Sequence, residues 1–167
     1  MKKLVLVAII AVFSFSNSNA QSGVLNGGIN IGLPMGDVDD SYGFNLGAEL
    51  NYMFTVGEGF TFGPSIEYSH FFGKEISGGA ITFDVPDASF LPVSAAARFN
   101  VTQDFIIGAN LGYGIGLSPD GNDGGFYYKP VVGYKIGDNT QLNFSYSGIS
   151  VDGGTFSSLS LGLMFGL

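Results

Sequence analysis

A strict alternation of bulky apolar and small residues recurs eight times along this chain, and it runs without a break to the last residue. In the final stretch the bulky set is Leu159, Leu161, Leu163, Phe165 and Leu167, and the small set is Ser158, Ser160, Gly162 and Gly166. Side chains two residues apart lie on the same face of a strand. Each stretch therefore predicts a strand with one apolar face and one face of small, nearly uncharged side chains. A soluble sheet would carry charge on its wet face, so the pattern favours strands that cross a membrane.

The alternation also gives the positions of the strands. We predict them at residues 24–33, 44–56, 60–72, 89–100, 105–117, 126–136, 141–147 and 156–167. Most reach the roughly 9 to 11 residues that a tilted membrane strand needs, whereas the seventh is short. Backbone groups in lipid must all be bonded within the protein, so the sheet must close on itself. The expected fold is therefore all-β: an eight-stranded antiparallel up-and-down transmembrane β-barrel.

Residues 1–20 have the features of a cleaved secretory signal peptide. Lys2 and Lys3 give a positive start, residues 4–15 form an apolar run, and Ala20 ends a group of small residues suited to signal peptidase. The run is shorter than the roughly 20 residues of a transmembrane helix. We expect cleavage after Ala20 to leave residues 21–167 as the barrel domain; a retained N-terminal anchor is the alternative.

The connections between the predicted strands alternate in length. The long ones are residues 34–43, 73–88, 118–125 and 148–155, and the short ones are 57–59, 101–104 and 137–140. Outer-membrane barrels have short periplasmic turns and longer extracellular loops, so we expect both termini to face the periplasm. Aromatic residues gather near both ends of the strands, as expected for the girdles at the two membrane interfaces.

Four residues do not fit a regular barrel. Pro64, Pro92 and Pro130 lie inside predicted strands, where a closed barrel has no free edge to tolerate a missing N–H donor. Each proline therefore predicts a bulge or a lost ladder hydrogen bond. Phe156 is out of step with the bulky set of the last strand, which predicts an irregularity where that strand begins.

Phe90-Leu91-Pro92-Val93 running to Ala97-Arg98-Phe99 is similar to the proline-centred fourth strand of the outer membrane protein beta-barrel domain proteins. Over residues 21–167 the chain resembles the small outer-membrane β-barrels of the OmpX and OmpA-transmembrane-domain type. The last eight residues resemble the barrel-assembly signal of that class, with Ser160, Gly162, Phe165 and Leu167 at its key positions, although Leu167 replaces the usual terminal aromatic.

This resemblance implies a location and a set of partners. It implies the outer membrane of a Gram-negative type of cell, contact with outer-membrane lipid, and insertion by the barrel-assembly machinery with periplasmic chaperones. It also implies a monomer. It does not imply an activity, because this fold hosts adhesins, structural anchors, narrow channels and lipid-modifying enzymes.

Negative charge is concentrated on the long connections. The formal net charge is −8 for the whole chain and −10 without Lys2 and Lys3. The acidic residues on the long connections are Asp37, Asp39, Asp40, Glu75, Asp84, Asp87, Asp120, Asp123 and Asp152, against the single cation Lys74. An acidic surface repels nucleic acid and attracts basic partners or divalent cations. A simpler interpretation is that acidic loops aid solubility and suit Asp-Gly turns.

Four charged residues within the strands have inward parity, that is, they alternate with the bulky outward set and so point into the barrel. Glu49, Glu67, Arg98 and Lys129 sum to zero charge, and unpaired charge in a narrow interior is costly. We predict a lumen ion-pair network in which Lys129 reaches one of the two carboxylates. A selectivity constriction or gate is the alternative. Many other inward positions are Gly or Ser, which predicts trapped water or a small cavity rather than a continuous pore.

The sequence offers one weak catalytic candidate, His70 with an acidic residue of a long connection. His70 is the single histidine and has outward parity, whereas Ser69 has inward parity, so they do not form a dyad. Residues 120–124 fail the spacing of a calcium loop and are interpreted as a turn. We therefore expect no catalytic residues, no metal site and no cofactor.

Three functions fit these observations to different degrees. The leading one is a non-enzymatic outer-membrane barrel that holds four acidic extracellular loops for envelope integrity, adhesion or partner binding. The second is a narrow channel for small solutes or ions. The third is a soluble lipid-binding barrel, which would need charge on the outer face of its strands.

Overall fold

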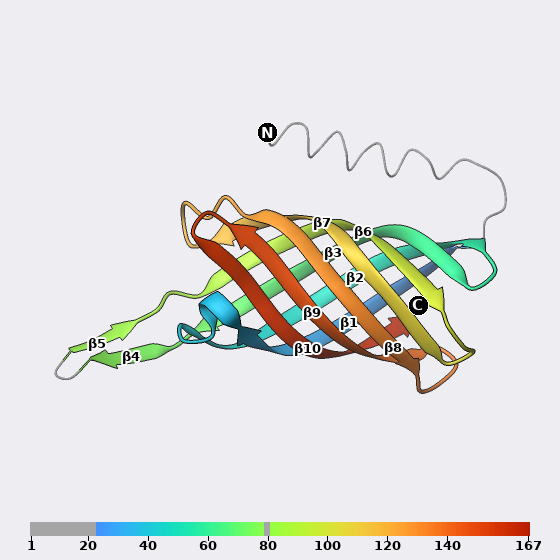
Figure 1. The fold of residues 1–167 in the computed structure, drawn as a ribbon, viewed down its shortest axis with the longest axis horizontal. Helices are drawn as coiled ribbons and strands as arrows, with labels where there is room; N and C mark the ends of the chain where they lie inside the picture. The colour runs from blue at the N-terminus through green and yellow to red at the C-terminus, as the bar shows by residue number, and fades with distance from the viewer. Residues whose placement is uncertain (1–22, 79–80) are drawn as a thin grey trace.

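The computed structural model describes residues 23–78 and 81–167, so the predicted signal peptide lies outside the described residues. Eight strands form a closed barrel in the order β1-β10-β9-β8-β7-β6-β3-β2 (Figure 1). They are β1 (Gly23–Met35), β2 (Tyr42–Gly57), β3 (Phe60–Gly73), β6 (Ala88–Asn100), β7 (Phe105–Ser118), β8 (Gly125–Lys135), β9 (Thr140–Val151) and β10 (Gly154–Gly166). Every neighbouring pair is antiparallel, which confirms the predicted fold class.

Closure between the first and last strands follows the predicted parity. Ile31 pairs with Leu161 on the outer face, and the adjacent pair of Gly32 with Ser160 lies on the inner face. A shift of one residue would exchange the two faces, so the alternation itself specifies this register.

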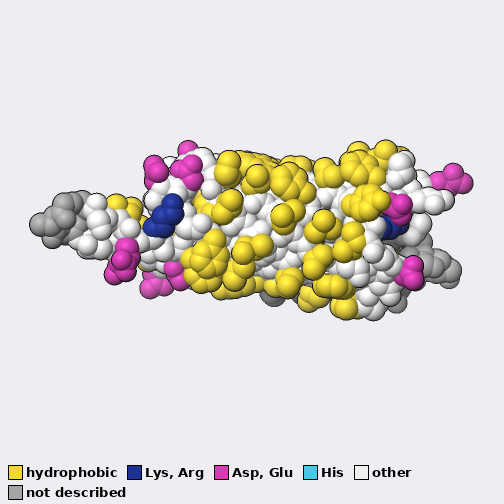
Figure 2. All heavy atoms as spheres, turned by 90° about the horizontal axis from the view of Figure 1, so that it is seen from below, with side chains coloured by type: hydrophobic (Ala, Val, Ile, Leu, Met, Phe, Trp, Pro, Cys, Tyr) yellow, Lys and Arg dark blue, Asp and Glu magenta, His cyan; other side chains and the backbone are white. Residues whose placement is uncertain are grey.

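The outer wall of the barrel is apolar along its length. Figure 2 shows hydrophobic side chains over the strands and acidic side chains gathered at the two ends. Ile29, Leu33 and Leu161 are each more than half exposed. Among the outward positions of the eight described barrel strands, His70 is the one Asp, Glu, Lys, Arg or His. Among the described residues, no helix is long and apolar enough to span a membrane.

Each of the three strand prolines interrupts one ladder and keeps the other. Beside Pro64 the β2–β3 ladder has a gap between the pairs Asn51↔Ser65 and Phe54↔Phe62. Beside Pro92 the β3–β6 ladder has a gap between Ile66↔Val93 and Ser69↔Phe90. Beside Pro130 the β8–β9 ladder has a gap between Tyr128↔Gly148 and Val131↔Ser145. The register is unchanged across every gap. The predicted loss of ladder pairing is confirmed, and it occurs without a bulge.

The inward glycines do not leave a wide lumen. The hydroxyls of Ser158 and Ser160 lie over Gly32, and the side chains of Asn30 and Glu67 lie over Gly47. Larger neighbours therefore fill the space that a missing side chain leaves, and the interior holds a cavity of about 10 Å³.

Two details of the last strands correct the sequence analysis. The seventh barrel strand is not short, because β9 continues to Val151, and the fourth long connection reduces to a turn at residues 152–153. Gly148 can continue the strand because the Tyr128 ring packs over its Cα and supplies the missing side-chain contact. The β9–β10 register is also continuous, so Phe156 marks no irregularity.

The remaining long connections carry short elements of their own. A 3₁₀ turn, η2 (Gly36–Val38), follows β1, and a separate hairpin of β4 (Glu75–Gly78) and β5 (Ile81–Asp84) lies between β3 and β6. Residues 119–124 form a turn in which Asn122 Oδ1 accepts from the Gly124 N–H. Three of the four expected long connections are thus long, and all four lie at the end of the barrel opposite the short turns.

Candidate functional site

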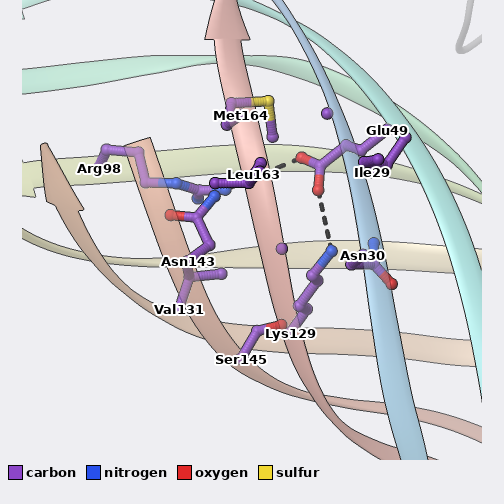
Figure 3. Close-up of a pocket in the computed structure, with 12 residues that line it drawn as sticks. Ile29, Asn30, Glu49, Arg98, Lys129, Val131, Asn143, Ser145, Leu163 and Met164 are labelled. Atoms are coloured by element: carbon purple, nitrogen blue, oxygen red, sulfur yellow. Dashed lines mark hydrogen bonds and ion pairs between the residues drawn. The ribbon is translucent and has the colours of Figure 1, made fainter. Parts of the chain in front are cut away.

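Three of the four charged residues with inward parity meet at the centre of the lumen. Lys129 Nζ donates to Glu49 Oε2 and to Glu67 Oε2, with both distances 2.9 Å. Each of these side chains is no more than 6% exposed, so the contacts are buried. Figure 3 shows Lys129 extending from β8 across the interior to Glu49 on β2.

Lys129 offsets the electrostatic repulsion between two carboxylates. Glu49 and Glu67 are direct cross-strand partners on β2 and β3. Like charges placed directly opposite each other destabilise a sheet, and the penalty rises inside a protein. The ammonium group contacts both carboxylates and reduces this repulsion.

Neutral polar side chains surround the carboxylates. Glu49 Oε1 accepts from Asn51 Nδ2, Ser65 Oγ and Asn110 Nδ2 at 2.9 to 3.1 Å. The Tyr127 hydroxyl donates to Glu67 Oε2 at 2.8 Å. The sequence predicted only the charged members of this network, although the inward positions of Asn51, Ser65, Asn110 and Tyr127 could have indicated the neutral ones.

Arg98 takes a partly separate position. Its Nη2 lies 3.9 Å from Glu49 Oε1, while its Nη1 donates to the carbonyls of Ala97 and Ala109. Arg98 and Asn143 line the cavity of about 10 Å³ beside Glu49 (Figure 3). That volume suffices for about one water molecule.

An aromatic cap closes the lumen on the long-loop side of these ion pairs. Its buried rings belong to Tyr42, Phe71, Phe90 and Tyr127, with the partly buried Phe156 packed against them, and Val38, Ala88 and Ile149 complete the buried cluster. The ring centroids of Phe71 and Phe90 each lie within 5.4 Å of Phe156, which therefore points inward rather than joining the girdle. Tyr127 belongs to both layers, because its ring packs in the cap and its hydroxyl bonds Glu67.

A polar cluster lies outside the barrel at the base of the β4–β5 hairpin. Asp87 accepts from the Gly73 N–H at 2.9 Å, and its other oxygen lies 3.1 Å from His70 Nε2. These hydrogen bonds, that of Gly73 first, lower the pKa of Asp87. Ser69 faces the opposite way, where its hydroxyl accepts from Asn45 Nδ2 inside the barrel.

The proposed barrel-assembly positions lie along β10 and at its end. Ser160 is buried in the interior and Gly162 faces the same way, next to Asn30. Phe165 and Leu167 are exposed on the outer surface.

Comparisons with known proteins agree on the fold and on nothing finer. No family model matches the chain, and no curated protein matches it. Ail, the attachment invasion locus protein of Yersinia pestis, shares 15% identity with a TM-score of 0.57, covering 88% of this chain and 99% of Ail. Neisserial surface protein A shares 14% identity with a TM-score of 0.54, covering 89% of this chain and 100% of that protein. A de novo designed transmembrane β-barrel matches with 11% identity and a TM-score of 0.56, covering 90% of this chain and 100% of the design. The chain thus has the fold of small outer-membrane β-barrels.

Proposed function

We propose that this protein is an integral outer-membrane β-barrel without enzymatic activity. In this proposal it presents acidic extracellular loops for envelope integrity, adhesion or partner binding, and the ion pairs of Glu49, Glu67, Arg98 and Lys129 plug its lumen. One observation carries the membrane assignment: the outer wall is apolar around a closed barrel. A large contiguous apolar surface is tolerated where another apolar phase covers it, and lipid does so here.

The orientation follows from the two ends of the barrel. The short turns and the C-terminus lie at one end, and η2 and the β4–β5 hairpin lie at the other (Figure 1). Short turns are typical of the periplasmic side. We therefore assign both termini to the periplasm and the acidic connections to the cell surface. Barrel-assembly machinery and periplasmic chaperones would act during biogenesis, and the mature barrel would be a monomer in outer-membrane lipid.

The absence of enzymatic activity is supported by the polar cluster at His70. The imidazole contacts Asp87 and the Tyr68 hydroxyl, while the adjacent Ser69 hydroxyl is on the other side of the wall. A hydrolytic site needs a nucleophile within hydrogen-bond reach of its base on one accessible face.

Refolding into lipid vesicles tests the membrane assignment. We expect residues 21–167 to insert, to migrate as a heat-modifiable band, and to stay folded when residues 75–84 are replaced by a short Gly-Ser linker. A refolded chain that stays monomeric and soluble without detergent would instead favour a soluble lipid-binding barrel.

A narrow channel is the second candidate. It is favoured by the polar groups on the short-turn side of the lumen, where Arg98 and Asn143 line the cavity beside Glu49. The aromatic cap argues against it, because a permeating ion would have to cross tightly packed apolar rings.

The ligand of Ail offers a contrast. That protein has been solved with the heparin analogue sucrose octasulfate, a polyanion. The acidic connections of the present chain would repel a polyanion and favour a cationic partner.

A further inference from the structure

The β4–β5 hairpin stands apart from the barrel. Its two strands form their own sheet and project beyond the long-loop end (Figure 1). At its base the Val85 N–H donates to the Lys74 carbonyl at 3.0 Å, and Asp87 Oδ1 accepts a hydrogen bond from the Gly73 N–H. An isolated two-stranded hairpin in water is marginally stable, and its outer edges carry unpaired backbone groups.

The two faces of the hairpin have opposite character. Glu75 pairs with Asp84, and the next pair is Ile76 with Phe83. Neighbouring pairs point to opposite faces, so one face presents two carboxylates and the other presents two apolar side chains. Ile76 is 43% exposed and Phe83 is 63% exposed, so a large part of each side chain is open to solvent.

Each pair carries a cost in the free protein. The carboxylates of Glu75 and Asp84 lie directly opposite each other and repel, and the Ile76–Phe83 pair, although an apolar cross-strand pair is itself favourable, leaves apolar surface in water. The nearest cation on the same connection does not relieve the repulsion, because Lys74 Nζ donates to the carbonyl of Asp39 at 2.6 Å.

A third strand would remove both costs at once. A segment that pairs with a free edge supplies backbone hydrogen bonds, and its side chains alternate between the same two faces. Basic residues at alternate positions would meet Glu75 and Asp84, and apolar residues between them would cover Ile76 and Phe83. Because side chains alternate between the two faces of a strand, one bound segment can meet the carboxylates with its basic residues and the apolar pair with its apolar residues.

We propose that the β4–β5 hairpin binds an extended cationic polypeptide segment in which basic and apolar residues alternate. The inference rests on the proposed function, because it requires the long-loop end to face the outside of the cell. The acidic residues of the other long connections strengthen the attraction at long range, whereas the hairpin supplies the pattern that selects the segment.

The test uses the chain refolded in zwitterionic vesicles and two labelled synthetic peptides of the same composition. One peptide alternates lysine and leucine, and the other has its lysines in one half and its leucines in the other. We expect the alternating peptide to bind the protein-containing vesicles about tenfold more tightly, after subtraction of binding to empty vesicles. Equal binding of the two peptides would overturn the proposal.

Matched variants locate the contact. Glu75→Lys with Asp84→Lys should weaken binding of the alternating peptide by about tenfold, on the scale of two cross-strand charge pairs. Asp120→Lys with Asp123→Lys makes the same change in net charge on another connection and should have a much smaller effect. Equal loss in the two double variants would reduce the interaction to general attraction by an acidic surface.

A second variant tests the apolar face. Ile76→Ser with Phe83→Ser keeps the net charge, so a loss of alternating-peptide binding would show that the apolar pair takes part, and unchanged binding would contradict the two-faced geometry. Heat-modifiable migration of every variant reports whether the barrel has folded. A barrel that inserts but does not bind the peptide refutes this inference alone, whereas failure to insert refutes the proposed function.

Discussion

Removal of the Lys129 ammonium should be among the most destabilising single changes in the barrel. Lys129→Met keeps much of the side-chain volume but leaves Glu49 and Glu67 facing each other, with Arg98 Nη2 3.9 Å from one of them. Breaking a buried pair by removing one partner costs roughly 3 to 5 kcal/mol, because the remaining charge is buried without compensation. Lys129 pairs with two carboxylates at 2.9 Å, which places the expected loss in this range.

The double variant Lys129→Met with Glu67→Gln should lose less, because it leaves Glu49 as the one carboxylate, with Arg98 and three neutral donors still beside it. Lys135→Met removes the same charge near the short-turn end and should change stability by about 0.5 kcal/mol or less. Urea unfolding in lipid vesicles, followed by heat-modifiable migration, measures all three. Equal losses in the single and double variants would refute the reasoning.

Three further predictions concern the wall, the cap and the hairpin base. Gly148→Val should destabilise the barrel by about 1 to 3 kcal/mol, because the new side chain meets the Tyr128 ring, whereas Gly57→Ala, with open space around it, should be nearly neutral in the same urea titration. Phe90→Ala should cost about 3 to 5 kcal/mol, because the ring is fully buried in the aromatic cap; a loss below about 1 kcal/mol would mean that the cap is loosely packed. The pKa of Asp87 is lowered in the folded state, so its stabilising effect is present above the ordinary aspartate pKa and is lost as the pH falls through the lowered value. Proteolysis of the hairpin should therefore increase in that acidic range, and Asp87→Asn should make it fast at neutral pH as well; cleavage of the variant at the unchanged rate would contradict this role.

The sequence predicted the barrel because its alternation has a direct structural meaning. Parity alone assigned Leu161 to the outer face and Ser160 to the interior, and it placed the charges of Glu49 and Lys129 in the lumen. The positions of most strands agree with the structure to within two residues at each end.

Parity does not give distances across the lumen. It could not show that Lys129 lies between two carboxylates, or that Tyr127 connects them to an aromatic cap. An aromatic residue near a strand end suits a girdle as well as a cap, so the sequence alone does not show that Phe156 packs inside the lumen. The true extent of β9 was hidden because Gly148 contributes no side chain, and the Tyr128 ring from the neighbouring strand takes its place.

Planar-bilayer recording of the purified, folded barrel tests the central claim most directly. The account predicts no stable single-channel steps, because the ion pairs of Lys129 and the aromatic cap together fill the lumen. Stable steps whose size changes with Glu67→Gln would contradict it and would make the narrow channel the better description of this protein.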